Sequence, residues 1–334
     1  MMAGGSYLDL IPLFDVSKSH LYRVFHEFTN WIISLYEFPL PRWLQEGKWE
    51  TLTKAAEHFS ESTDGIYYGP FGALGGLAIQ IASPTLQEVS DPGNYYCRKG
   101  FYALNVQAIC NHSKCFLWMN LLNKGSSHGS AAFTGSQLYQ LLEEKAEELC
   151  KRGIFIVGDS AYGLTPFLIV PYDSADVKND RTLSLDSFNF HLSSCRIFIE
   201  CAFGELIMRW GIFWRTLLFD LKKATRIIQA AMLLHNFIID NDREDERYYQ
   251  EFTVPNDRTQ QELLRITGKI PRPLVSDNNE RSVGGRHSRE EQYHKEKGKT
   301  IRHRLTVKLA INDLKRPLQY DMHYNDLGHI YMTS

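Results

Sequence analysis

Two carboxylates lie in settings where a carboxylate is unusual. Asp159 directly follows the apolar run IFIVG, which is typical of a buried strand. A carboxylate at the carboxyl end of a strand projects beyond the sheet, where open α/β sheets gather their ligands. Glu200 lies inside the apolar helical run CRIFIECAFGELIMRW, although acidic residues are seldom buried unless they are paired or bound to a metal. One carboxylate after a strand and a second in a later helix are the layout of a two-metal phosphoryl-transfer site holding Mg²⁺ or Mn²⁺.

Each residue also has a simpler interpretation. An aspartate at a strand end often only shapes a turn, and Glu200 could form a salt bridge with Arg196 on the adjacent helical turn. If the two residues do share a cation, their carboxylates should converge to within about 4 to 6 Å.

Basic residues occur near both carboxylates in the sequence. They could hold a phosphate backbone, which positions DNA without specifying its sequence, or they could be ordinary solvated surface. They are Arg98, Lys99, Arg196, Arg209, Lys222, Lys223 and Arg226.

Composition excludes several classes of protein. The 334 residues are 43% hydrophobic, which is enough for a globular core, but no apolar stretch approaches the length of a membrane span. The N-terminus lacks the features of a signal peptide, so we expect a soluble, intracellular protein. The six cysteines form no CxxC pair and are expected to be reduced, mostly buried thiols. A net charge of −2 does not by itself indicate a nucleic-acid binder.

The central part, residues 65–240, alternates apolar strands and helices. Strands are expected in GALGGLAIQI, FYALNVQAICN, KCFLWMNLLN, IFIVGD and FLIVPY, and helices in TGSQLYQLLEEKAEELCKRG, SCRIFIECAFGELIMRWGIF and KKATRIIQAAMLLHNFIID. This order predicts an α/β fold with a mixed sheet flanked by helices. It is compatible with an RNase H-like core.

The two ends have a different character. Residues 1–60 are helical in pattern: a short helix, the turn DVS and a long helix capped by Ser17 and opening with Lys18, His20 and Arg23. They suggest a partial helix-turn-helix DNA-binding segment, with an ordinary helical hairpin as the alternative. Residues 241–334 are polar and charged and predict a largely flexible tail with one helix, KTIRHRLTVKLAINDL. Its basic residues Arg302, Arg304 and Lys308 could touch DNA or serve nuclear import.

Several blocks together resemble the PIF/Harbinger-type transposases and the nucleases domesticated from them. The resemblance is carried, in the family's order, by SYLDLIPLFDVSKSHLYRVF, NYYCRKGFYALNVQAIC, NKGSSHGSAAFTGSQLY, GDSAYGLTPFLIVPYD, SSCRIFIECAFGELIMRWGIFWRTL and AAMLLHNFIID. It covers most of residues 7–240. The resemblance implies an RNase H-like fold with an Asp-Asp-Glu triad that cuts DNA with a divalent metal. Asp159 matches the second member of the triad and Glu200 the third.

The first member of the triad is missing. In the block GALGGLAIQI, where the family carries Asp-Gly, this chain has Gly75-Gly76, and two further family aspartates are replaced by Asn111 and Gly129. Glycine offers no ligand and no charge to offset two dications, and losing one member of a catalytic unit commonly costs several orders of magnitude in rate. Glu61 or Asp64 could replace it only if the chain folded back on itself. His128 is interpreted as a structural or phosphate-side residue.

The resemblance therefore implies a transposase-derived, Mg²⁺- or Mn²⁺-dependent DNA endonuclease with impaired cleavage. The alternatives are a catalytically dead DNA-binding protein and the product of a decayed transposable element. It also implies DNA and a second, Myb-like DNA-binding protein as partners. A homodimer is considered as well, and the expected location is the nucleus, with the cytoplasm as an additional location.

Overall fold

The computed structural model describes residues 11–63, 65–127, 129–242, 289–316, 323–324 and 330–331. At its centre is a five-stranded sheet in the order β3-β2-β1-β4-β5. The strands are β1 (Pro70–Gln80), β2 (Ala103–Cys110), β3 (Phe116–Lys124), β4 (Phe155–Val157) and β5 (Leu168–Ile169). β2 is antiparallel to both of its neighbours, β1 and β3, whereas β4 pairs with β1, and β5 with β4, in the parallel sense. The α/β prediction is confirmed, and the arrangement is RNase H-like.

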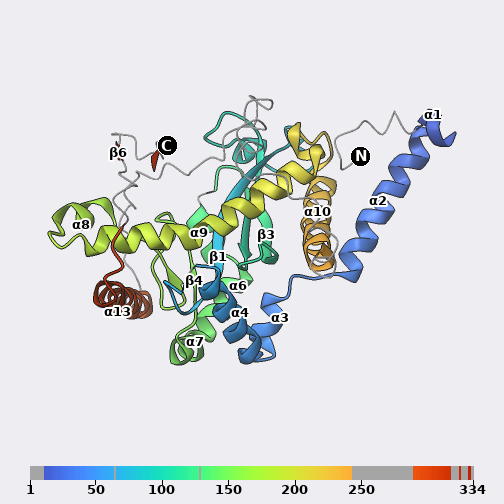
Figure 1. Cartoon of the computed structure of the whole chain (residues 1–334). Coiled ribbons are helices and arrows are strands. Elements are labelled where there is room, and N and C mark those ends of the chain that lie inside the picture. Colours follow the sequence, from blue (N-terminus) through green and yellow to red (C-terminus); the bar gives the residue numbers. More distant parts are fainter. Residues whose placement is uncertain are drawn as a thin grey trace.

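One face of the sheet is covered by long helices. α9 (Ser184–Arg209) crosses this face, and α10 (Leu221–Asp242) and α13 (Arg289–Ile311) lie beside it (Figure 1). Ala73 of β1 and Val157 of β4 pack there with Ile199 of α9. We call this side the α9 face.

Shorter helices cover the opposite face. They are α3 (Leu40–Gln45), α4 (Trp49–Glu61), α5 (Gly129–Thr134), α6 (Gln137–Glu144) and α7 (Ala146–Arg152). Leu74 of β1 and Ile156 of β4 pack against this layer, because successive side chains of a strand point to opposite faces. We call this side the α6 face.

The sequence predicts one helix over residues 134–153, but the structure divides it. The chain breaks at Lys145, which ends α6 and begins α7. The break lets Leu142 and Leu149 both enter the same core. Gly153 then ends α7 in the left-handed region, with φ of 67°, a conformation that glycine adopts without steric cost.

At the N-terminal end, α1 (Ile11–Phe14) and α2 (Lys18–Leu35) follow the predicted helix, turn and helix. The Ser17 side chain accepts a hydrogen bond from the backbone N–H of His20, so the predicted N-cap is confirmed. α2 packs along α10. The two helices run in the same direction, because Tyr22 contacts Phe219 just before α10 and Tyr36 contacts Phe237 near its end.

The predicted C-terminal helix is present and longer than expected. The sequence places it at 299–314 in a solvated tail, whereas α13 begins at Arg289 and packs against α9. Leu309 joins the core of the α9 face, so residues 289–316 are not a loose tail. The pattern alone did not reveal this, because only one side of the helix is apolar enough to be buried.

The remaining described elements are short: η2 (Pro92–Tyr95), α8 (Ser174–Asn179), η3 (Gly211–Trp214), β6 (His323–Tyr324) and β7 (Ile330–Tyr331). The six cysteines form no disulfide, and only Cys150 and Cys201 are partly exposed, as expected. Among the described residues, none of the helices has the length and apolar character that a membrane span requires.

Candidate functional site

Gly75 and Asp159 lie just beyond the paired part of two neighbouring strands. Val157, the last residue of β4, pairs with Ala73 of β1 in the parallel sense. Gly75 lies two residues further along β1, and Asp159 lies two residues beyond Val157, in the turn that follows β4. Since side chains alternate along a strand, Gly75 belongs to the α9 face, as Ala73 does. The pairing of β1 with β4 thus brings the two segments close together.

Position 75 is directed at α9. A Cβ atom on Gly75 would lie 3.0 Å from both Cγ atoms of Ile199 and 3.6 Å from the ring of Phe203. Glu200 is the next residue on the same helix. Position 75 therefore faces the helix that carries Glu200, but the space beside it is occupied by an isoleucine side chain.

Glu200 is paired within its own helix. Arg196 Nη1 lies 2.5 Å from Glu200 Oε1, and the side chains are 24% and 39% exposed. The salt bridge considered as the simpler interpretation of Glu200 is confirmed. A fixed positive charge already neutralises this carboxylate.

Asp159 has a local task in the turn after β4. Its Oδ1 accepts a hydrogen bond of 2.8 Å from the backbone N–H of Ala161, and its carbonyl accepts one of 3.2 Å from Tyr162. This is the hydrogen-bonding pattern of an aspartate that shapes a turn. The turn-forming interpretation is therefore confirmed.

Tyr162 connects Asp159 and Arg196 electrostatically. Burial raises the pKa of the Tyr162 phenol well above its usual value, the charge of Asp159 raises this pKa further and the charge of Arg196 opposes the rise. One phenol thus senses both the aspartate after β4 and the arginine that pairs with Glu200. Asp159 and the Arg196–Glu200 pair lie within electrostatic reach of the same group.

On the α6 face the same tyrosine belongs to a neutral network that the sequence analysis missed. The Tyr162 hydroxyl donates to Gln107 Oε1 at 2.5 Å, and Gln107 Nε2 donates to Asn105 Oδ1 at 2.7 Å. Asn105 in turn donates to the Ser127 carbonyl at 2.8 Å. The signal in the sequence was the alternation of Asn105 and Gln107 within an otherwise apolar strand, which places two polar side chains on one face.

The two other positions where a family aspartate is replaced, Asn111 and Gly129, lie in a turn and beside the neutral network. Asn111 Oδ1 accepts backbone hydrogen bonds from Ser113 and Cys115, both 3.0 Å long, and so shapes the turn between β2 and β3. A Cβ atom on Gly129 would lie 3.5 Å from the Tyr162 hydroxyl and from Gln107 Nε2. Gly129 therefore borders the neutral network.

The donor set does not suit a pair of divalent ions. Gly75 supplies no ligand, Glu200 is paired with Arg196 and Asp159 accepts a hydrogen bond from its own turn. Throughout the described residues, no group of three or more His, Cys, Asp or Glu side chains is arranged to hold a metal. Glu61 is exposed at the end of α4. Asp64 and His128 lie outside the described residues.

Two groups of predicted DNA contacts meet at one end of the α2–α10 pair. Lys18, His20 and Arg23 are exposed at the start of α2. At the start of α10, the Lys223 ammonium lies 5.4 Å from the centre of the Tyr22 ring, and Lys222 beside it is exposed. Since the helices are parallel, their N-terminal ends and basic residues lie together. Glu27, 3.8 Å from Arg23, and Asp220, 2.7 Å from Lys223, offset part of this charge.

The other predicted basic contacts have varied surroundings. Arg209 is half-buried and donates to His235 Nδ1 at 3.1 Å. Arg98 and Lys99 are exposed before β2; desolvation lowers the pKa of Lys99, and the adjacent Arg98 acts in the same direction. Arg226 donates to Asn30 Oδ1 and so joins α10 to α2.

Helix α10 forms hydrogen bonds to the backbone of the β2–β3 hairpin. His235 is fully buried, with its Nε2 3.1 Å from the Lys114 carbonyl. Asn236 bonds to both backbone groups of Phe116 at 2.7 Å, much as a neighbouring strand would. No local pattern in AAMLLHNFIID reveals these roles of His235 and Asn236, because their partners are more than a hundred residues away.

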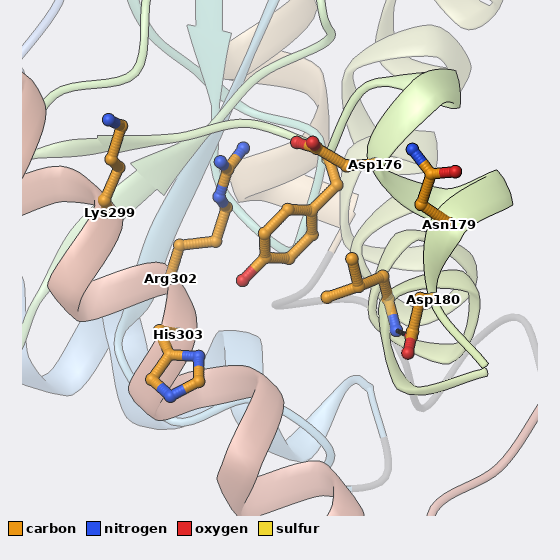
Figure 2. Close-up of a pocket in the computed structure, with 8 residues that line it drawn as sticks. Asp176, Asn179, Asp180, Lys299, Arg302 and His303 are labelled. Atoms are coloured by element: carbon orange, nitrogen blue, oxygen red, sulfur yellow. Dashed lines mark hydrogen bonds between the residues drawn. The ribbon is translucent and has the colours of Figure 1, made fainter. Parts of the chain in front are cut away.

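A surface pocket of 620 Å³ lies between α8 and α13. Figure 2 shows Lys299, Arg302 and His303 on one side and Asp176, Asn179 and Asp180 on the other. The Arg302 guanidinium stacks 3.9 Å over the Tyr172 ring and donates to the Pro171 carbonyl at 2.9 Å. Arg302 therefore fastens α13 to the domain, in place of the surface role considered for it.

Comparison with known proteins agrees with the geometry. Residues 74–236 match the family described as DDE superfamily endonuclease. The chain is 24% identical over 180 residues to a Xenopus laevis protein named Putative nuclease HARBI1, covering 52% of this chain and 47% of that protein. It is 25% identical over 253 residues to the Arabidopsis thaliana protein Antagonist of Like Heterochromatin Protein 1, covering 72% and 60%.

A third relative, the Arabidopsis thaliana protein ALP1-like, is 28% identical over 152 residues, covering 42% of this chain and 36% of that protein. The matched regions thus span less than two thirds of each relative. No solved structure matches the chain. Residues 74–236 contain β1 from Leu74 onward, the other four strands of the sheet, and Gly75, Asp159 and Glu200. This part of the chain is a DDE superfamily endonuclease domain, and its distant relatives are Harbinger-derived proteins.

Proposed function

We propose that this protein is a transposase-derived DNA-binding protein in which metal-dependent cleavage is impaired because Gly75 replaces the first ligand. The observation that carries the proposal is the environment of position 75, which faces α9 beside Glu200 but is packed against Ile199. In this proposal Asp159 and Glu200 are the two remaining ligands of the ancestral Mg²⁺ or Mn²⁺ site.

Charge balance supports the loss of cleavage. Two divalent ions need several carboxylates to offset their charge, and a third ligand from the central strand would face both. Here two carboxylates remain, and the Arg196 guanidinium already neutralises one of them. A second cation would therefore meet a repelling charge where the ancestral site offered an attractive one.

The basic end of the α2–α10 pair supports DNA binding. Lys18, Arg23 and Lys222 are exposed there, and the partial positive charges of two helix N-termini add to theirs. Such a surface neutralises phosphates whatever the base sequence, so its affinity falls steeply with salt. The family resemblance adds the proposals of a nuclear location and of a Myb-like partner.

Nicking of supercoiled plasmid in Mg²⁺ or Mn²⁺ tests the loss of cleavage. We expect no cutting by the natural chain and restored cutting by Gly75→Asp combined with Ile199→Ala, which makes room for the new side chain. Gly75→Asp alone should cut less, since Ile199 must yield by a few tenths of an ångström. Gly76→Asp is the matched control, because position 76 faces Gln107 on the α6 face, and it should not cut.

Equal cutting by the natural and restored chains would contradict impairment and would identify an active endonuclease with another ligand. DNA binding is measured separately, by fluorescence anisotropy at several salt concentrations. Lys222→Ala should lower the salt slope by about one unit, whereas Lys151→Ala on α7 should leave it unchanged. Failure of the natural chain to bind DNA would refute the binding function.

A further inference from the structure

Helix α2 has two apolar seams, and among the residues that the structure describes only one of them has a partner. The inner seam faces α10 and contains Phe25, Thr29 and Ile32, all buried. Ile32 packs with Ala230 and Leu233 of α10. This contact accounts for one side of the helix.

The outer seam consists of Leu21, Val24, Phe28, Trp31 and Leu35. These residues follow one another at spacings of three, four, three and four, which is the heptad pattern of a helix that packs against another helix. Val24, Phe28, Trp31 and Leu35 are 44%, 46%, 55% and 53% exposed. The Phe28 and Trp31 rings lie 6.0 Å apart, so the exposed surface is continuous.

The exposed area matches one side of a protein interface. Four large side chains about half exposed present roughly 400 Å² of apolar surface, given about 150 to 250 Å² for each aromatic. A standard interface buries about 800 Å² per partner, of which somewhat more than half is apolar. The outer seam therefore supplies the apolar part of one such interface.

We propose that the outer seam pairs with the outer seam of a second copy of this chain, in antiparallel orientation, about a two-fold axis near Phe28. The seam is complementary to itself in that arrangement. Leu21 lies against Leu35 of the second copy, and the small Val24 lies against the large Trp31. An isologous contact of this kind forms a closed dimer.

Charge favours the antiparallel orientation. Lys18, His20 and Arg23 lie at the start of α2, whereas Glu37 follows its end and no basic side chain occurs between Ser34 and Phe38. An antiparallel pair sets the basic ends against the C-terminal ends of the opposite helices, where cations are favourable. A parallel pair would place the basic ends against each other.

This inference concerns the apolar outer seam of α2 and does not rest on the DNA binding proposed for the basic start of the same helix. Sedimentation velocity of the full chain over a concentration series tests it. We expect a dimer whose dissociation constant rises roughly 100-fold or more with Trp31→Glu, because a central tryptophan commonly carries much of an interface's energy. Ser19→Glu adds the same charge at an exposed position off the seam and should leave the dimer intact.

A monomer at every concentration, or a dimer indifferent to Trp31→Glu, would overturn the proposal. Circular dichroism should show equal helix content in both variants, since Trp31 is exposed in the single chain. Binding of an added helical partner by a monomeric chain would assign the seam to another protein and would likewise overturn self-pairing.

Cysteine cross-linking tests the orientation, in a chain whose partly exposed Cys150 and Cys201 are replaced by serine. Phe28→Cys should cross-link two copies, because the axis passes near this residue. Val24→Cys should not, because its counterpart would be about eight residues, or about 12 Å, away along the helices. Equal cross-linking by both variants would indicate parallel helices and refute the antiparallel arrangement.

Discussion

The two faces of the sheet carry different kinds of polar side chain. On the α9 face they are ionisable: the Arg196–Glu200 pair and the buried His235 with Arg209. On the α6 face Asn105, Gln107 and Tyr162 form a neutral hydrogen-bonded network. The adjacent glycines of β1 mark the division, since position 75 faces Ile199 and position 76 faces Gln107.

This difference shows how a fold can stay packed after the residues of a charged site have changed. A neutral network whose members bond to one another is complete without a ligand. A face that once held carboxylates around cations needs two changes when a carboxylate is lost. A positive side chain must neutralise a remaining carboxylate in place of the cation, and another side chain must fill the space of the lost one. Here Arg196 and Ile199 do these two things, and the core around them stays packed.

The largest expected change in the free energy of unfolding tests whether α13 contributes to the core of the α9 face as much as α6 contributes to the core of the α6 face. Leu309→Ala on α13 and Leu142→Ala on α6 remove side chains that are 2% and 0% exposed. Each should lower the free energy of unfolding by about 2 to 5 kcal/mol, measured by urea denaturation. Ile311→Ala, at a residue 78% exposed on the same helix, should change it by less than about 0.5 kcal/mol. A negligible effect of Leu309→Ala would mean that α13 is not part of the core.

The next prediction is that the stability contributed by the α9 face depends on pH, because His235 is buried there. Burial, opposed by the hydrogen bond to the Lys114 carbonyl and reinforced by Arg209, lowers the pKa of His235 from 6.5 to about 4. The unfolded chain therefore binds a proton at a higher pH than the folded chain does. Stability is complete above about pH 7 and declines as the pH falls from 6.5 towards 4, by about 3 kcal/mol in total.

Urea denaturation at several pH values measures this loss. His235→Gln keeps a polar side chain at the position but does not titrate, so it should flatten the slope between pH 6.5 and 4. An unchanged slope would place the acid sensitivity in other groups, such as His191 and His26, whose pKa values burial also lowers.

The smallest effect concerns the neutral network. Tyr162→Phe removes the donor to Gln107 Oε1 and leaves that buried oxygen unsatisfied, which should cost about 1 to 3 kcal/mol. The loss should be the same at pH 5 and pH 8, because burial keeps the phenol neutral across this range. Tyr68→Phe, at an exposed tyrosine, is the matched control. A strongly pH-dependent loss would contradict a phenol that stays neutral throughout this range.

Local patterns in the sequence predicted a good part of this molecule. The central strands, α10, the second half of α9 and the Ser17 cap were predicted, because hydrophobic periodicity and capping are properties of neighbouring residues. The first half of α9, from Ser184, was not predicted. The break at Lys145 and the docking of α13 were not, since both depend on how distant surfaces fit together. The outer seam of α2 was visible as apolar periodicity, but the sequence did not distinguish it from the inner one.

For the site, the sequence by itself determined that Asp159 follows a strand, that Glu200 lies in an apolar helix and that glycine stands where a first carboxylate is expected. Only the tertiary structure decided that β4, which precedes Asp159, pairs with β1, which carries Gly75. It also decided that Ile199 fills the space at position 75 and that the basic starts of α2 and α10 meet. The reason is physical. A residue type fixes which ligand or charge is available, whereas strand register and helix packing, set by contacts between remote parts of the chain, fix where it lies.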